Sequence, residues 1–397
     1  TGAATFITVA GGSNIILDGS GNAFAAAVTM QAGNGSNAVF GNITFVDSAA
    51  VKLHTSAGTN GDLFIDSHPD RAVGGNLSIT ATTGNITQGA AVAVTGTSSF
   101  TTSASDADIT LSNTGNAFAS AVTLSTTGST AHATIDNGTT TLDIAASSVG
   151  GDLTLISGHA SGITDSGNVT VGRNLVATTN AGNGVINMDT LRVDGTIALT
   201  TEGNGAATVV NDAGLIFAAS TVRGALTATA TTGNITQDSG NLAITGAATF
   251  ITVAGGSNII LDGSGNAFAA AVTMRAGNGT NAAFGNITFV DSEGVKLHTS
   301  AGTNGDLFID GHPDRTVGGN LSITATAGDI TQGALAVTVT GTSSFTTLTN
   351  NRIITLSNTG NAFASAVTLS TTGSSAHATL DNGTANIDIA AASVGGN

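Results

Sequence analysis

Two copies of one short polar sequence carry the residue types best suited to chemistry. They read Asp66-Ser-His-Pro-Asp-Arg71 and Asp310-Gly-His-Pro-Asp-Arg315. Carboxylates and an imidazole so close in sequence could hold a cation or hydrogen-bond a sugar. The alternative is a protruding structural loop, in which the proline ends a strand and Asp70 pairs with Arg71. The ligand-binding candidates are therefore Asp66, His68, Asp70, Asp310, His312 and Asp314.

A second polar motif, Asp-Gly-Ser-Gly-Asn, occurs at 18–22 and 262–266. Its oxygen-bearing side chains suit a hard cation such as calcium, but it lacks the spacing and terminal Glu of an EF-hand loop and the repeated glycines of calcium-binding solenoids. A turn is the favoured interpretation. Asn there tolerates unusual φ angles and bonds the backbone with its side chain. The equivalent asparagines are Asn22, Asn116, Asn266 and Asn361.

The remaining histidines, His54, His132, His159, His298 and His377, stand in strand-like or glycine-rich segments. We expect them to be solvated or structural residues. No Gly-Lys-Ser/Thr phosphate loop follows the glycine-rich stretches, and no nucleophile elbow with triad partners is evident. The sequence therefore predicts no enzyme, no metal site and no cofactor.

Composition excludes several classes of protein. The 397 residues include 55 Gly, 2 Pro and no Cys, Trp or Tyr, and only 9% are charged. Without Cys there are no disulfides, thiolate metal sites or c-type haems. A net charge of -16 disfavours nucleic acid and anionic membrane surfaces as partners. No apolar run approaches the ~18 residues of a membrane helix. The sequence begins at Thr1, with neither a Met nor a leader-like segment, so we expect a mature product or an excerpt of a longer protein.

Internal repetition determines the architecture. Residues 1–30 recur unchanged as 245–274, and the match extends over 1–152 against 245–397, leaving 153–244 as intervening turns. A weaker inner repeat begins at Thr1, Thr95, Thr245 and Thr340. Positions that we expect to face outward differ between the two copies, since Gln31 and Ala49 become Arg275 and Glu293. Positions that we expect to face inward keep their identity in the second copy, namely Ile43, Phe45, Leu53, Leu63 and Ile65.

Apolar residues alternate with Thr, Ser, Asn or Asp in segments such as 77–81, 122–125, 142–145 and 153–156. This period of two predicts short strands, and Gly-Asn, Asp-Gly and Ser-Gly pairs between them predict tight turns. We therefore expect an all-β fold, a parallel β-helix (β-solenoid) running over 1–397 as one continuous domain. Coils of roughly 20 residues would give about 18 to 20 turns. A β-sandwich is the alternative, but small Ala, Thr and Val suit a narrow solenoid interior.

Recurring motifs resemble a known family. Gly-Asn-Leu-Ser-Ile-Thr-Ala at 75–81, Gly-Asn-Ile-Thr-Gln at 84–88 and Asp-Ile-Thr-Leu-Ser-Asn-Thr-Gly-Asn-Ala-Phe at 108–118 are similar to the repeat regions of filamentous-haemagglutinin-like large exoproteins. Gram-negative bacteria secrete these by the two-partner route. The resemblance implies a right-handed β-helical rod outside the cell that works as an adhesin, a fibril or a component of the biofilm matrix.

We thus expect an extracellular or cell-surface structural and adhesive protein. Its partners would be copies joined end to end or the continuation of a longer chain, together with surface glycans or other cells. The alternative is a carbohydrate-binding or polysaccharide-degrading β-helix with its site near Asp66, His68 and Asp70. A flat array of Thr that orders water is a further possibility, although the Thr pattern looks irregular along the sequence and Thr favours strands in any case.

Overall fold

The computed structural model describes residues 2–33, 41–53, 62–65, 72–277, 284–297, 306–309 and 316–396, without the side chains of 62–65, 72, 306–309 and 316. Its regular structure is β-strand throughout the described residues. The strands stack in parallel as a β-solenoid of about 15 turns of about 23 residues. The predicted fold class is confirmed, but the turns are longer and fewer than the ~20 residues expected from strand and turn lengths. None of the described residues forms a helix able to span a membrane.

The chain divides into two compact units, 1–195 with 200–203, and 196–199 with 204–397. In the first unit the strands are β1 Ala4–Thr8, β2 Ile15–Leu17, β3 Val28–Ala32, β4 Ile43–Asp47, β5 Val51–Leu53, β6 Asp62–Ile65, β7 Ala72–Val73, β8 Leu77–Ala81, β9 Ile86–Gln88, β10 Ala93–Val94, β11 Ser98–Ser105, β12 Ile109–Leu111, β13 Ala117–Phe118, β14 Val122–Thr127, β15 Ala133–Asp136, β16 Leu142–Ile144, β17 Ser147–Val149, β18 Leu153–Ser157, β19 Ile163–Asp165, β20 Val169–Val171, β21 Leu175–Gly182 and β22 Ile186–Val193.

The residues of β23 Thr196–Glu202 are divided between the units. The second unit continues with β24 Ala207–Asn211, β25 Leu215–Phe217, β26 Ser220–Val222, β27 Leu226–Ala230, β28 Ile235–Gln237, β29 Leu242–Ile244, β30 Ala248–Thr252, β31 Ile259–Leu261, β32 Ala267–Phe268, β33 Val272–Ala276, β34 Ile287–Asp291, β35 Val295–Leu297, β36 Asp306–Ile309, β37 Thr316–Val317, β38 Leu321–Ala325, β39 Ile330–Gln332, β40 Thr338–Val339, β41 Ser343–Thr347, β42 Ile354–Leu356, β43 Ala362–Phe363, β44 Val367–Ser370, β45 Ala378–Leu380 and β46 Ile389–Ser393.

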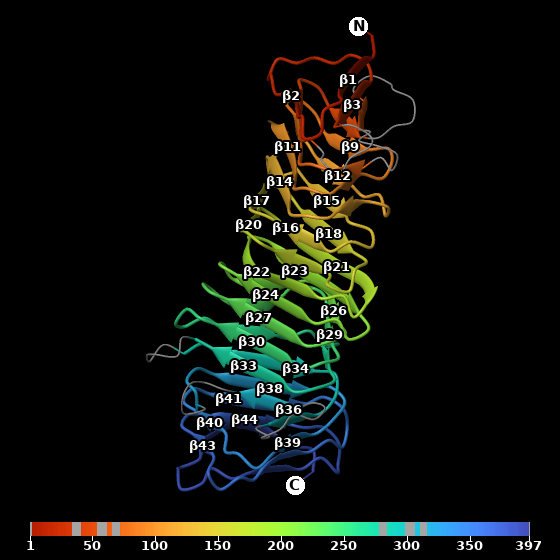
Figure 1. Ribbon diagram of the computed structural model, residues 1–397. Helices are drawn as coiled ribbons and strands as arrows, with labels where there is room; N and C mark the ends of the chain where they lie inside the picture. The colour runs from red at the N-terminus through yellow and green to blue at the C-terminus, as the bar shows by residue number, and fades with distance from the viewer. Residues whose placement is uncertain are drawn as a thin grey trace. The chain divides into compact units, whose positions relative to one another are not determined.

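A strand commonly pairs with the strand three places further along the chain, as β11 does with β14, β12 with β15 and β27 with β30. Three strands therefore make one turn, and each face of the solenoid is a parallel sheet (Figure 1). Register keeps like residues in line: Phe100 pairs with Leu124 and with Ile79. The segments predicted as strands at 77–81, 122–125, 142–145 and 153–156 are strands β8, β14, β16 and β18.

Inward side chains form the core of each unit. Strands such as β4, β8 and β30 alternate buried and half-buried residues, the burial pattern that a period of two predicts. Phenylalanine rings from different faces contact one another within this core. In the second unit, Phe250 contacts Phe217 and Phe268 with ring centroids 5.9 and 6.1 Å apart, both edge to face.

Burial explains which positions differ between the two long repeats. Ile43, Phe45 and Leu53, which keep their identity, are 0–1% exposed. Ala49 and Glu293, which differ, are exposed, and Gln31 and Arg275 are half-buried. Leu63 and Ile65 belong to β6, whose side chains are not described. The predicted inward assignment of Ile43, Phe45 and Leu53 is confirmed.

Replacing Phe250 with Ala should lower the free energy of unfolding of the second unit by about 3–5 kcal/mol, because it opens a cavity between two rings. Ile251→Ala is the matched control, since Ile251 lies next along β30 and is only half-buried. We expect it to cost about 1 kcal/mol. Urea unfolding followed by circular dichroism gives both values. Equal losses for the two variants would contradict the stacked core.

Candidate functional site

The predicted ligand-binding residues lie outside the described part of the chain. This holds for Asp66, His68, Asp70, Asp310, His312 and Asp314, and also for His54 and His298. Their role therefore stays a prediction. Across the residues that are described, no three His, Asp or Glu side chains gather closely enough to hold a metal ion. Asp18 and Asp262 of the calcium-like motif are both exposed.

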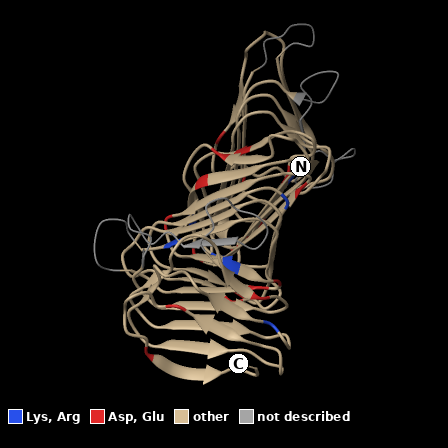
Figure 2. Ribbon diagram, turned by 90° about the horizontal axis from the view of Figure 1, so that it is seen from below, with Lys and Arg blue, Asp and Glu red and all other residues tan. Residues whose placement is uncertain are grey.

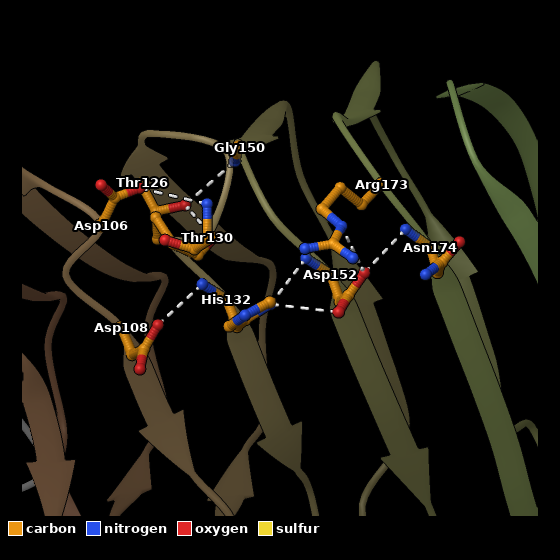
Figure 3. A network of polar contacts seen from close by, with 10 residues as sticks. Asp106, Asp108, Thr126, Thr130, His132, Gly150, Asp152, Arg173 and Asn174 are labelled. Atoms are coloured by element: carbon orange, nitrogen blue, oxygen red, sulfur yellow. Dashed lines mark hydrogen bonds and ion pairs between the residues drawn. The ribbon is translucent and has the colours of Figure 1, made fainter.

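A polar network in the first unit is centred on His132 (Figure 3). Asp108, His132, Asp152 and Asn174 each stand directly before the first buried residue of a strand, in β12, β15, β18 and β21. Each of the first three side chains accepts the backbone N–H of the next residue in this series. The distances are 2.8 Å from His132 N to Asp108 Oδ1, 2.9 Å from Asp152 N to His132 Nδ1 and 3.0 Å from Asn174 N to Asp152 Oδ1. The network is thus a ladder that runs from turn to turn.

One ion pair, between Asp152 and Arg173, reinforces this ladder. Asp152 Oδ2 lies 3.2 Å from His132 Nδ1, and its Oδ1 lies 3.7 Å from Arg173 Nε. All three side chains are at least a third exposed, so water and salt screen the attraction. Because His132 Nδ1 accepts a backbone N–H, the neutral imidazole carries its proton on Nε2. The ring thus binds the next turn of the backbone, and no nucleophile is hydrogen-bonded to it in this network.

Asp106 closes a turn beside the ladder. Its backbone has a φ of 62°, and Oδ1 accepts the N–H of Thr130 at 3.1 Å. The Thr130 side chain and then its backbone N–H hold the pKa of Asp106 below its usual range. Gly128 stands opposite, where a Cβ would come within 2.3 Å of Asp106 Oδ1. This carboxylate therefore also serves the local backbone.

Asparagines form the same kind of ladder elsewhere in both units. Asn14 Oδ1 accepts Asn42 N and Asn42 Oδ1 accepts Asn76 N, each at 2.8 Å. In the second unit Asn234, Asn258, Asn286 and Asn320 repeat the arrangement, with N···Oδ1 distances of 2.7–2.8 Å. The preceding glycines allow the turns to approach, since a Cβ on Gly75 would lie 2.4 Å from the carbonyl oxygen of Gly41. The Gly-Asn-Leu/Ile motif is therefore a stacking motif.

Buried amides link two other motifs. The Gln of each Gly-Asn/Asp-Ile-Thr-Gln segment pairs with the Asn of a later Gly-Asn-Ala-Phe segment. Asn Nδ2 donates to Gln Oε1 at 3.2 Å in Asn116–Gln88, 2.9 Å in Asn266–Gln237 and 3.0 Å in Asn361–Gln332. In each pair the Gln Nε2 donates to the Asn Oδ1 in return. Sequence reasoning found both motifs but not their pairing.

The prediction of an unusual φ for the asparagines of the Gly-Asn-Ala-Phe turns is wrong. None of Asn22, Asn116, Asn266 and Asn361 has a positive φ, whereas Asp106, Asn183 and Asn351 do. Asparagine is needed at these positions because its side chain is buried and hydrogen-bonded there. Asn116 is 2% exposed and also binds Val92 N, Leu111 O and Asp136 O. The predicted bonding of the side chain to the backbone is confirmed.

Asn116→Ala should lower the free energy of unfolding of the first unit by about 2–4 kcal/mol, because it leaves several buried backbone groups without partners. Thr114→Ala is the control, since Thr114 is exposed in the same turn. Chemical unfolding measures the difference. A loss no larger than that of the control would show that the amide pair contributes little.

Outward hydroxyls form regular columns. Strands β8, β11 and β14 place Ser and Thr side by side in two files, and β38, β41 and β44 repeat them in the second unit. All of these residues are half-buried. The files are Ser78–Ser99–Thr123, Thr80–Thr101–Ser125, Ser322–Ser344–Thr368 and Thr324–Thr346–Ser370. The pattern looks irregular in sequence because turn lengths vary, yet it presents evenly spaced hydroxyl groups.

Stacked parallel strands, buried amide pairs and side-chain ladders define a repeat β-solenoid. The chain belongs to the family described as repeats of unknown function (DUF5649), which matches residues 40–125, 204–275 and 284–370. The first and third matches cover corresponding parts of the two long repeats. No curated protein and no solved structure matches the chain. The likeness to filamentous-haemagglutinin-like exoproteins stays a prediction.

Proposed function

We propose that the chain is a structural segment of a β-solenoid rod in a fibril at the cell surface or in the extracellular matrix of a Gram-negative bacterium, and that it has no enzymatic activity. The observation that carries this proposal is the use of the polar side chains. His132, Asp152 and Asn116 direct their polar atoms at the backbone of neighbouring turns. Polar atoms that are hydrogen-bonded to the backbone stabilise the stack of turns and are not available to bind a substrate.

Surface charge supports the same proposal. Over the part of the chain that the structure describes, Figure 2 shows Asp, Glu, Lys and Arg thinly scattered on the ribbon, with no dense basic area. A net charge of -16 keeps the surface acidic, which disfavours nucleic acid. Near-identical repeats suit a component whose length matters more than any one position. We propose that such units join end to end or continue in a longer chain, and that the surface contacts glycans or other cells.

Immunogold electron microscopy of the source cells, with antibody raised against this chain, tests location and assembly together. Label along surface filaments or in the matrix between cells is the expected result, and protease treatment of intact cells should remove it. An antibody against a cytoplasmic protein is the control. Label confined to the cytoplasm would contradict the proposal.

Carbohydrate binding is the second candidate function, favoured by the hydroxyl columns. A sheet face with evenly spaced Ser and Thr could hydrogen-bond a polysaccharide of regular repeat. The absence of Trp and Tyr counts against it, since sugars commonly stack on those rings.

Retention on insoluble polysaccharides, with an assay for new reducing ends, tests this second function. Thr80→Val with Thr101→Val should weaken retention at least several-fold if the columns bind, whereas Thr134→Val, on β15 of another face, should not. No retention and no cleavage of any bacterial or plant polysaccharide would remove the alternative.

A further inference from the structure

A buried carboxyl group stands at the end of β34. Asp291 points inward and is 0% exposed. Its carboxyl accepts backbone N–H groups of Phe268, Ser292 and Glu293, the last at 3.4 Å from Oδ1. Its other oxygen, Oδ2, is buried and has no hydrogen-bond partner among the described residues. An acceptor buried in this way is costly unless a donor meets it.

At the equivalent position of other turns the residue is asparagine, and its hydrogen bonds show which donor and acceptor this position needs. Asn137 Oδ1 accepts the N–H of Phe118 at 2.7 Å, and its Nδ2 donates to the carbonyl oxygen of the same residue at 3.0 Å. Asn382 binds Phe363 in the same way, at 2.7 and 3.3 Å. One amide thus satisfies both backbone groups of a phenylalanine at the end of a short strand. Asp47, the equivalent of Asp291 in the first long repeat, accepts the N–H of Phe24 at 3.3 Å.

Both backbone groups of Phe268 point to the side of β32 away from β29. In a strand, the N–H and C=O of one residue point to the same side. The other side of β32 is occupied by β29, where Ala269 N donates to Ile244 O. Since the N–H of Phe268 meets the Asp291 carboxyl, its C=O points to the same side of β32 as that carboxyl. A carboxylate offers only acceptors to this pair, whereas a carboxylic acid offers one acceptor and one donor, as an amide does.

We propose that Asp291 is a neutral carboxylic acid whose Oδ2–H donates to the carbonyl oxygen of Phe268, forming a link between turns that opens when the acid ionises. Burial raises the pKa of Asp291 to about 6, in the direction the geometry requires. Ionisation of Asp291 then lowers the stability of the second unit as the pH rises.

The surroundings add little charge. Strands β31, β32 and β38, which pack around Asp291, contain no titratable residue. On β35, Lys296 is exposed and points outward. Glu293, exposed two residues on, raises the pKa of Asp291 slightly through like charge, after burial as the main cause. The charged group to control for is therefore Glu293.

The direction of the pH effect follows from linkage. The folded pKa of about 6 is above the ordinary value of 3.8, so the folded state binds more protons between them. The stabilising contribution is complete below about pH 4 and is lost as the pH rises through about 6. The unfolding equilibrium constant should rise on the order of 100-fold across this window from this group alone.

Asp291→Asn tests the proposal, with Glu293→Gln as the control. Urea unfolding of the full chain at pH 4.5 and 7.5 should show that Asp291→Asn removes the loss of stability at the higher pH and changes little at the lower. Glu293→Gln should leave most of the pH effect in place. If Asp291→Asn destabilises the unit equally at both pH values, or the wild type shows no loss in this window, the proposal is overturned.

Two further measurements extend the test, and the first of them does not depend on that variant being stable. Asn137→Asp should introduce a new loss of stability at high pH in the first unit, since it recreates the acid at a fully buried position. An infrared carboxylic acid C=O band should be present at pH 5 in wild type minus Asp291→Asn difference spectra and fade by pH 8. No such band, together with stabilisation of wild type alone by added sodium or calcium ions, would show that a cation faces Oδ2 instead.

Discussion

Parallel stacking at the spacing of hydrogen-bonded strands, about 4.8 Å, is the constraint on which this structure depends. Each turn must present its backbone to the turns before and after it. This forces close contact where the chain bends: a Cβ on Gly41 would lie 1.8 Å from the carbonyl oxygen of Ser13. The same spacing aligns Phe100 with Ile79 and Leu124 in the core and brings the backbone N of Asp152 to 2.9 Å from His132 Nδ1. Core, turns and polar ladders are therefore three consequences of one repeat distance.

Turns create the main energetic problem, because backbone groups at a strand end lose their ladder partners. Amide side chains solve it by supplying a donor and an acceptor together. Asn116 serves the turns before and after its own, and Asn137 completes the backbone bonding of Phe118. Buried polar networks stabilise a fold when every member is satisfied. This explains a composition rich in Asn, Ser and Thr with few charges.

Local pattern was enough to predict strands, since alternation in 77–81 reproduces β8 to the residue. It also identified inward residues such as Phe45. The local pattern does not predict which side chains pair between turns. Gln88 and Asn116 lie 28 residues apart, and Gln237 and Asn266 lie 29 apart, so no fixed spacing reveals them. The predicted bonding of the Asn116 side chain to the backbone is confirmed and only the predicted unusual φ is wrong, because burial cannot be read from a turn motif. The candidate loop at 66–71 lies outside the described residues.

Comparison of the two long repeats bears on whether the His132 network is a functional site. Asp108 receives the N–H of His132 in the first copy, but the corresponding residue of the second copy is Ile353, while His377 is kept. The hydrogen bond to Asp108 comes from the backbone N–H of His132 and not from its imidazole, so the change to isoleucine removes one hydrogen bond of the ladder. A stacking ladder tolerates the change, since the parallel backbone pairing of β42 with β45 persists without that carboxylate. The duplication therefore favours a role in which each turn contributes a share of stability over one in which a single turn carries the function.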